Sequence, residues 1–273
     1  MAPGCVLGRP RTSNQYAGSL RPCQACFSRA RGAAASQGEA LTFKSACVVG
    51  AGRVGKALAA RLAERIPTRT TGREIDVGDA ELVVICVPDR AIVEVAEAIE
   101  PGPWVAHTSG ACRLDALEPH ERRFSLHPLQ TFVLDLGPEQ LDGSWAAVSG
   151  GDDEALTAGR ELAALLGVTP FELDDDERPL YHAAAHFASA FLVTLHDVAA
   201  ELMEAAGASP EALAPLMRRT MENGFSHTGP LVRGDWETIE RHLDAIGSRR
   251  PQLLALYRAL ADTEAALLGV RAR

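Results

Sequence analysis

A glycine-rich turn constrains the fold of this chain more than any other feature. The turn reads Gly50-Ala51-Gly52-Arg53-Val54-Gly55. An apolar run over 46–49 precedes it, and the pattern over 56–63 predicts a helix. In such a setting the first glycine permits a tight turn, the second lets the backbone approach a pyrophosphate, and the third permits close packing of helix and strand. We therefore predict a dinucleotide-binding turn, with a purely structural turn as the alternative.

The order of predicted elements indicates the fold class. Strand-like runs predict further strands over 82–87, 104–107, 123–126 and 145–148, and a short strand is also expected over 68–73. Strands that alternate with helices predict a Rossmann-type α/β domain with a doubly wound parallel sheet, which we place over 43–150. After Gly150 only helices are predicted, with one long helix over 177–206. We assign 151–273 to a helical domain for substrate binding and dimerisation.

The end of the second predicted strand bears on the choice of nucleotide. Arg73 and the hydroxyl of Thr71 suit the 2′-phosphate of NADP, and Arg69 adds charge. Glu74 and Asp76 support the competing choice of NAD, because an acid there would bind the ribose hydroxyls. We expect NADP as the cofactor and keep NAD as the alternative.

Polar residues gather at other predicted strand ends, which line the cofactor crevice in sheets of this type. Val87 and Pro88 are expected beside the cofactor. His107 and Thr108 are expected to bind the substrate, and Ser109 and His127 to take part in catalysis. Singly, each of these residues would more often be structural, but two polar strings at one crevice favour a site.

A stripe on the long predicted helix is the other candidate. His182, His186 and Ser189 share one face at spacings of four and three. We expect His182 to be catalytic and His186 and Ser189 to bind substrate across the cleft between the domains. A hydrogen-bonded core stripe is the alternative, and no metal is expected because a third ligand is not evident.

Charge and composition limit the partners. The net charge is −9, which argues against binding to nucleic acid or to an anionic membrane surface, and no window approaches eighteen consecutive apolar residues. Residues 1–42 are arginine-rich and lack apolar periodicity, so we expect a disordered tail or a misplaced start, with a transit peptide as the alternative. The Cys23–Cys26 pair within it is a weak zinc candidate. Because no secretory signal is evident, we expect a cytoplasmic protein.

Together these strings resemble one family, the Rossmann-like proteins that carry the helical domain of unknown function DUF2520. The matching strings are GAGRVG (50–55), VVICVPD (83–89), HTSGA (107–111), SLHPLQTF (125–132), LYHAAAHFAS (180–189) and GPLVRGDWETIERHL (229–243). The family is similar in build to pyrroline-5-carboxylate reductase, ketopantoate reductase and 6-phosphogluconate dehydrogenase. The resemblance implies an NADP-dependent oxidoreductase that acts on a small molecule and forms a homodimer through its helical domain.

The resemblance also points to residues. The glycine turn would bind phosphates, Ser109 and Gly110 would lie near the nicotinamide, and His127 and His182 match motif histidines. Three residues match a later motif that would face the cleft: Arg233, Asp235 and His242.

The chain departs from the family pattern in three places. Ala190 stands where the family commonly has asparagine, the segment 73–81 is short, and the segment 223–229 is abbreviated. The first departure bears on catalysis, because an amide on that helix holds the substrate or cofactor in related reductases. An oxidoreductase in which His127 or His182 acts as the acid is our leading hypothesis. There are two alternatives. One is a non-catalytic nucleotide-binding sensor or scaffold, and the other is a structural dimer.

Overall fold

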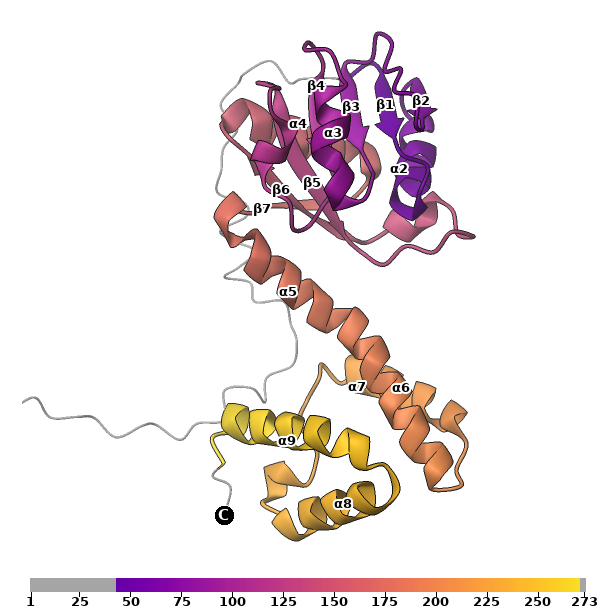
Figure 1. Ribbon diagram of the computed structural model, residues 1–273, viewed down its shortest axis with the longest axis vertical. Helices are drawn as coiled ribbons and strands as arrows, with labels where there is room; N and C mark the ends of the chain where they lie inside the picture. Colours follow the sequence, from indigo (N-terminus) through magenta and orange to yellow (C-terminus); the bar gives the residue numbers. More distant parts are fainter. Residues whose placement is uncertain (1–42, 271–273) are drawn as a thin grey trace, which may run out of the picture. The chain divides into compact units, whose positions relative to one another are not determined.

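The computed structural model of the protein describes residues 43–270 (Figure 1). The predicted tail over 1–42 and its Cys23–Cys26 pair lie outside the described residues. The chain divides into two compact units, and the division falls between Phe191 and Leu192.

A seven-stranded sheet forms the frame of the first unit. Its strands are β1 (Ala46–Val49), β2 (Thr68–Thr71), β3 (Leu82–Ile85), β4 (Trp104–His107), β5 (Arg123–Leu129), β6 (Trp145–Gly150) and β7 (Thr169–Glu172). The spatial order is β2-β1-β3-β4-β5-β6-β7, and the five strands from β2 to β5 in this order are parallel. The predicted Rossmann-type fold is confirmed.

Helices cover both faces of this sheet. On one face, α2 (Arg53–Ala63) and α4 (Asp153–Leu166) bury leucines such as Leu58 and Leu162 against the strands. On the other face, α3 (Ile92–Glu97) buries Ile92. The link between β2 and β3, which includes the short segment 73–81, contains no helix.

One strand pair departs from the predicted parallel sheet. β6 pairs with β5 in the antiparallel sense, so that Ser125 lies opposite Ser149. The link between them contains only the short 3₁₀ helix Pro138–Leu141. Parallel neighbours usually need an α-helical crossover, and α4 provides one between β6 and β7, which are parallel.

The predicted domain boundary at residue 150 is too early. β7 adds to the edge of the sheet, and α4 packs on the sheet as part of the same core. The sequence pattern concealed β7 because Pro170 interrupts a four-residue run, and proline in a sheet is confined to edge strands and bulges.

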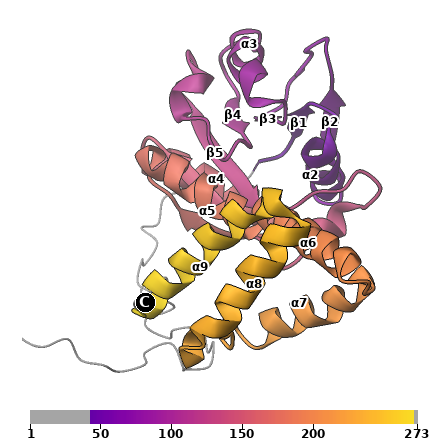
Figure 2. The same ribbon diagram turned by 60° about the horizontal axis from the view of Figure 1, so that its bottom comes forward.

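The remaining helices are α5 (Arg178–Ala188), α6 (Ala190–Ala205), α7 (Leu213–Glu222), α8 (Trp236–Arg249) and α9 (Leu254–Leu268). The predicted single helix over 177–206 is interrupted at Ser189, whose φ of −124° and ψ of −82° are not helical. In the second unit α8 and α9 lie side by side (Figure 2) and bury Ile239 and Ala265 between them.

One helical run, 175–205, is long and apolar enough to cross a membrane by length and composition alone. A single run of this kind is weak evidence, because core helices of water-soluble proteins pass the same test. The expectation of no membrane association stays a prediction.

Because α4 belongs to the core of the sheet, we expect substitutions of a leucine on α4 and of an exposed leucine on α5 to change the free energy of unfolding by different amounts. Leu162→Ala removes a fully buried side chain and is expected to lower the free energy of unfolding by about 2–5 kcal/mol. Leu180→Ala removes a side chain that is 71% exposed and is expected to change it by less than about 0.5 kcal/mol. Denaturant unfolding measures both, and equal effects would contradict this assignment of α4.

Candidate functional site

Two of the three turn glycines are required by the protein's own packing. Gly50 has a φ of +112°, and a Cβ there would lie 2.5 Å from the carbonyl oxygen of Cys86, just after β3. A Cβ on Gly55 would lie 1.9 Å from the carbonyl oxygen of Gly50. These contacts bring the end of β3 and the start of α2 against the turn, as the glycine pattern predicts.

Gly52 differs from both. Its φ of −73° suits any residue, and a Cβ there would meet no atom within 4 Å. Packing within the described residues therefore gives no reason for glycine at this position. A ligand that needs close approach to the backbone would give one.

The start of α2 favours an anion. Gly52 is the N-cap residue, and it provides no side-chain cap. The first turn holds no acidic side chain, while Arg53 within it is exposed. The first amides of a helix lack intrahelical partners and carry partial positive charge, so the turn can bind a phosphate.

The end of β2 presents one free arginine. Asp76 is paired with Arg69 at 3.6 Å between Nη2 and Oδ2. The hydroxyl of Thr71 donates to the carbonyl of Glu74 and so helps to shape the loop. Arg73 is exposed and makes no ion pair with any residue in 43–270. Of the residues predicted to bind a 2′-phosphate, Arg73 is thus the one left unengaged.

Val87 and Pro88 follow β3, as predicted. The Cγ1 atom of Val87 lies 3.2 Å from the position that a Cβ on Gly50 would occupy. Pro88 is the N-cap of the 3₁₀ helix Asp89–Ala91. The structure therefore brings the first of these two residues directly to the glycine turn.

A second polar cluster forms where β4 ends and α5 begins. A Cβ on Gly110 would lie 2.7 Å from Cδ2 of His182 and 3.0 Å from both Cε1 and Nε2 of His127. The two imidazoles meet edge to face with their centroids 6.0 Å apart. Both predicted histidines thus reach the same backbone position, and they do so because residue 110 has no side chain.

Tyr181 completes this cluster, and the sequence analysis did not select it. Its hydroxyl lies 2.7 Å from Nδ1 of His127. The stripe at 182, 186 and 189 that selected His182 does not include Tyr181, so the signal that could have found it is its helical spacing of three from Arg178.

Burial favours the uncharged forms of His127 and Tyr181. Burial, together with the charges of His182 and Arg178, lowers the pKa of His127 to about 4. Burial also raises the pKa of Tyr181 to about 12. At neutral pH the imidazole is uncharged and the phenol keeps its proton. His127 is therefore not the group with a pKa near neutrality that the sequence analysis expected.

Ser109 is 8% exposed, and its hydroxyl oxygen accepts the amides of Ala111 and Cys112 at 3.1 and 2.9 Å. This predicted catalytic residue therefore holds the shape of its own loop. The hydroxyl of the predicted substrate residue Thr108 donates to the carbonyl of Ile85 at 3.4 Å.

His107 occupies a different place from the one predicted. It is fully buried, and neither ring nitrogen has a hydrogen-bond partner among the described residues. Burial lowers its pKa to about 4, and the charge of Arg178 adds to the effect. Its neighbour in the register, Ser125, is also buried with an unpartnered hydroxyl. Because the side chain has no exposed surface, His107 lies beneath the site and not at its surface.

The rest of the predicted helical stripe separates from the cluster. His186 is exposed and contacts the ring of Phe191 edge to face at 4.5 Å. Ser189 donates to the carbonyl of Ala185 at 2.7 Å. Of the three stripe residues, only His182 meets the loop at Gly110. Among residues 43–270, no cluster of three or more potential ligands could hold a metal.

A buried arginine joins the loop to α5. Arg178 has no exposed surface and donates to the carbonyl of Ser109 at 3.0 Å, to Oγ of Ser149 at 3.0 Å and to Asp175 at 2.8 Å. Asp175 in turn accepts the amide of Leu114 at 3.0 Å. No sequence pattern marked Arg178, because its partners come from distant segments.

The residues of the later motif lie in the second unit and have local partners there. Asp235 caps α8 by accepting the amide of Thr238 at 3.1 Å. Arg233 donates to the carbonyl of Thr228 at 2.9 Å, and His242 bonds the hydroxyl of Tyr257 at 2.7 Å.

Comparison with known proteins supports the resemblance seen in the motifs. Residues 144–264 match the family described as "Domain of unknown function (DUF2520)". The resemblance to the DUF2520 family is confirmed. The search of the curated proteins found no match.

Solved structures share the fold over about four-fifths of the chain. A protein from Bacteroides fragilis called "putative NADP oxidoreductase BF3122" has a TM-score of 0.67 at 20% identity, with 81% of this chain and 97% of that chain covered. Protein TM1727 from Thermotoga maritima has a TM-score of 0.62 at 24% identity, with 80% and 99% covered. The imine reductase from Aspergillus terreus, in complex with NADPH4 and a dibenzazepine, has a TM-score of 0.56 at 16% identity, with 81% and 95% covered. At these identities the likeness establishes the fold.

The lowered pKa of His127 predicts an acid-sensitive contribution to stability. The unfolded chain binds a proton below the ordinary pKa of about 6.5, whereas the folded chain does so only near 4. Stability is therefore present above pH 6.5 and is lost as the pH falls through this window, by at most about 1.4 kcal/mol per pH unit for one proton.

His127→Gln should flatten this part of the pH dependence, while the exposed His196→Gln should not. Denaturant unfolding between pH 7 and 4 measures both variants. An unchanged slope in His127→Gln would contradict the burial of a neutral imidazole.

Proposed function

We propose that the protein is an NADP-dependent oxidoreductase, a reductase or dehydrogenase that acts on an unidentified small polar substrate. The single observation that carries this proposal is Gly52. Its neighbours Gly50 and Gly55 are explained by internal packing, whereas Gly52 has open space around it, which would let a phosphate approach the backbone of the turn closely. The exposed start of α2 adds a charge preference for phosphate.

The preference for NADP over NAD rests on Arg73. Of the two acids that would favour a ribose 2′-hydroxyl, Asp76 is already paired with Arg69, whereas Glu74 is exposed and has no ion-pair partner among the described residues. Arg73 is exposed and without an ion-pair partner among the described residues, so it is available to a 2′-phosphate. The names of the Bacteroides fragilis and Aspergillus terreus proteins mention NADP and NADPH4, and those of two other similar structures mention NAD+ and NADH, so the names support a nicotinamide cofactor of either kind.

The residues present fit such a cofactor: the turn over 50–55 would hold the pyrophosphate, and Arg73 the 2′-phosphate. A bound nicotinamide would supply the hydride chemistry. The chain's own part is to hold protons at defined atoms. With a raised pKa, Tyr181 keeps its proton and donates it in a hydrogen bond to Nδ1 of His127. The neutral imidazole then carries its proton on Nε2, the nitrogen that lies against Gly110.

A neutral imidazole N–H is a hydrogen-bond donor, and a polarised substrate oxygen or nitrogen beside Gly110 would be its acceptor. We therefore propose that His127 polarises the substrate and that Tyr181 fixes its tautomer. His182 remains the candidate acid, since it is exposed and its Cδ2 atom lies 2.7 Å from the position that a Cβ on Gly110 would occupy. Homodimer formation stays a prediction.

Gly52→Ala tests the nucleotide-binding turn without disturbing the fold. The new methyl group meets no protein atom, so the melting temperature should not change. It stands where a phosphate would approach, so the Kd for NADPH should rise at least about tenfold, or about 1.4 kcal/mol. Fluorescence titration with NADPH measures the affinity.

Gly151→Ala is the matched control, because it also meets nothing within 4 Å but lies outside the turn. Both the melting temperature and the affinity should stay unchanged. An identical NADPH affinity in Gly52→Ala and wild type would mean that the turn is only structural, and the oxidoreductase proposal would then fail.

Tyr181→Phe tests the proton-holding pair. Consumption of NADPH would be followed with a panel of 2-oxo acids and cyclic imines, and oxidation of hydroxy acids with NADP. We expect turnover of the best substrate to fall about 100-fold, because the tautomer of His127 is no longer fixed, while NADPH affinity stays the same. Tyr257→Phe is the control, since it breaks a tyrosine–histidine hydrogen bond of the same 2.7 Å length in the other unit. Equal turnover of the two variants would remove Tyr181 from this role.

Ala190 favours one other function, that of a non-catalytic NAD(P)-binding sensor or scaffold. The family that the chain resembles commonly has an asparagine here. NADPH binding without turnover in the wild type, together with turnover in Ala190→Asn, would support the sensor.

A further inference from the structure

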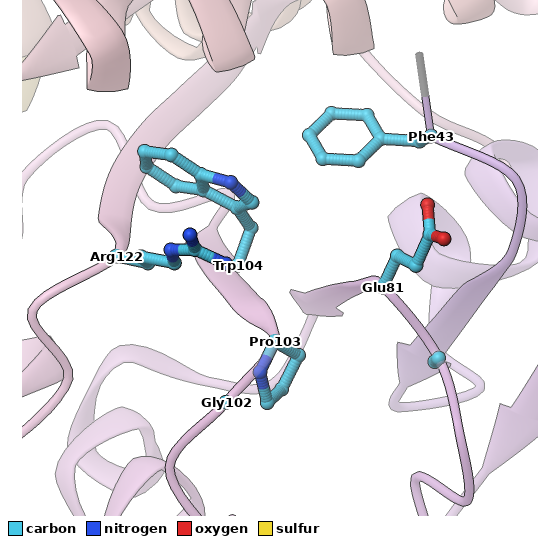
Figure 3. A pocket seen from close by; sticks show the side chains of 7 residues that line it. Phe43, Glu81, Gly102, Pro103, Trp104 and Arg122 are labelled. Atoms are coloured by element: carbon cyan, nitrogen blue, oxygen red, sulfur yellow. The ribbon is translucent and has the colours of Figure 1, made fainter. Parts of the chain in front are cut away.

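We propose that a second site, at the opposite edge of the sheet from the glycine turn, binds a zwitterionic α-amino acid with an apolar side chain. The site is a cavity of about 380 Å³ (Figure 3), within the range of roughly 300–1,000 Å³ typical of small-ligand pockets. Its lining residues are Phe43, Ala80, Glu81, Gly102, Pro103, Trp104 and Arg122.

The topology of the sheet builds this site. Phe43 precedes β1, Glu81 precedes β3, Trp104 begins β4 and Arg122 precedes β5. Because these four strands are parallel, their amino ends share one edge. Four segments that are distant in sequence therefore meet around one cavity.

A buried donor without a partner faces the cavity. Trp104 is 5% exposed, and its Nε1 atom has no hydrogen-bond partner. Figure 3 shows the indole nitrogen on the side of the ring toward Phe43. An unmade hydrogen bond in a buried group costs about 1–3 kcal/mol, so an acceptor supplied by a ligand would be stabilised here.

Opposite charges flank this donor. The guanidinium of Arg122 lies 6.0 Å from the centroid of the Trp104 ring, and on the other side of the cavity Glu81 extends beneath Phe43 (Figure 3). Oε2 of Glu81 accepts the amide of Lys44 at 2.9 Å. Neither Arg122 nor Glu81 forms an ion pair within the described part of the chain.

This arrangement selects the ligand class. Arg122 and the indole N–H together suit a carboxylate, and Glu81 suits an ammonium group. Phe43, Pro103 and Ala80 offer apolar walls for the side chain. A site with one cation does not suit a polyphosphate.

The site is separate from the nucleotide turn. The two sites lie at opposite ends of the strands. Four residues at roughly 3.3 Å per residue separate these ends by about 13 Å. Both sites can therefore be filled at once, and the amino-acid site does not depend on the proposed oxidoreductase activity.

Isothermal titration calorimetry of the full chain with L-phenylalanine tests the proposal. We expect saturable binding, with 3-phenylpropionate (no ammonium) and phenethylamine (no carboxylate) each at least tenfold weaker. Arg122→Gln and Glu81→Gln, both of exposed side chains, should each weaken binding of L-phenylalanine at least tenfold. Trp104→Phe keeps an aromatic ring but removes the N–H, and it should weaken binding as well.

Arg258→Gln is the matched control, because Arg258 is an exposed arginine in the other unit. It should leave L-phenylalanine binding unchanged, and all variants should keep the wild-type affinity for NADPH. No saturable heat with L-phenylalanine would overturn the proposal, and so would equal binding of 3-phenylpropionate. Loss of NADPH binding with L-phenylalanine binding retained would instead count against the oxidoreductase alone.

Discussion

The close approach of the Gly50 backbone to the Cys86 carbonyl is the contact on which the candidate site depends. Any side chain at residue 50 would overlap that oxygen at 2.5 Å, and any side chain at residue 55 would overlap the Gly50 carbonyl at 1.9 Å. With both glycines in place, β1, β3 and α2 converge at one point of the sheet edge. The exposed amides of α2 and the unhindered Gly52 then face outward, where an anionic ligand can reach them.

A second constraint organises the other half of the site. Arg178 carries a charge into the interior and is compensated by Asp175 and by two further acceptors. Burial of an unpaired charge would be costly, so these bonds tie the loop after β4 to the start of α5. That tie sets Tyr181 and His182 against the loop, and the same charge helps to keep His127 neutral.

The sequence pattern predicted the sheet well where local rules apply. The run Leu82–Ile85 is apolar throughout because it is buried on both faces, and the turn over 50–55 carries its own geometry in its glycines. β7 was missed because Pro170 obscures an edge strand. The break at Ser189 was missed although its hydroxyl makes a local bond to the carbonyl of Ala185, a bond that often bends helices.

The site was predictable only in part. His127 and His182 stood out as polar residues in apolar strings, and they do meet at Gly110. The burial of His107, the charge state of His127 and the role of Arg178 depend on partners from distant segments, which no local pattern reveals. Burial thus altered the chemistry of residues that the sequence had correctly selected.

Hydrogen–deuterium exchange of the wild-type protein with and without NADPH would test the central claim most directly. The claim predicts slower exchange in the peptide that covers 50–56, because the amides at the start of α2 would bind phosphate, and a further slowing around Arg73. Unchanged exchange over 50–56 at saturating NADPH would contradict it.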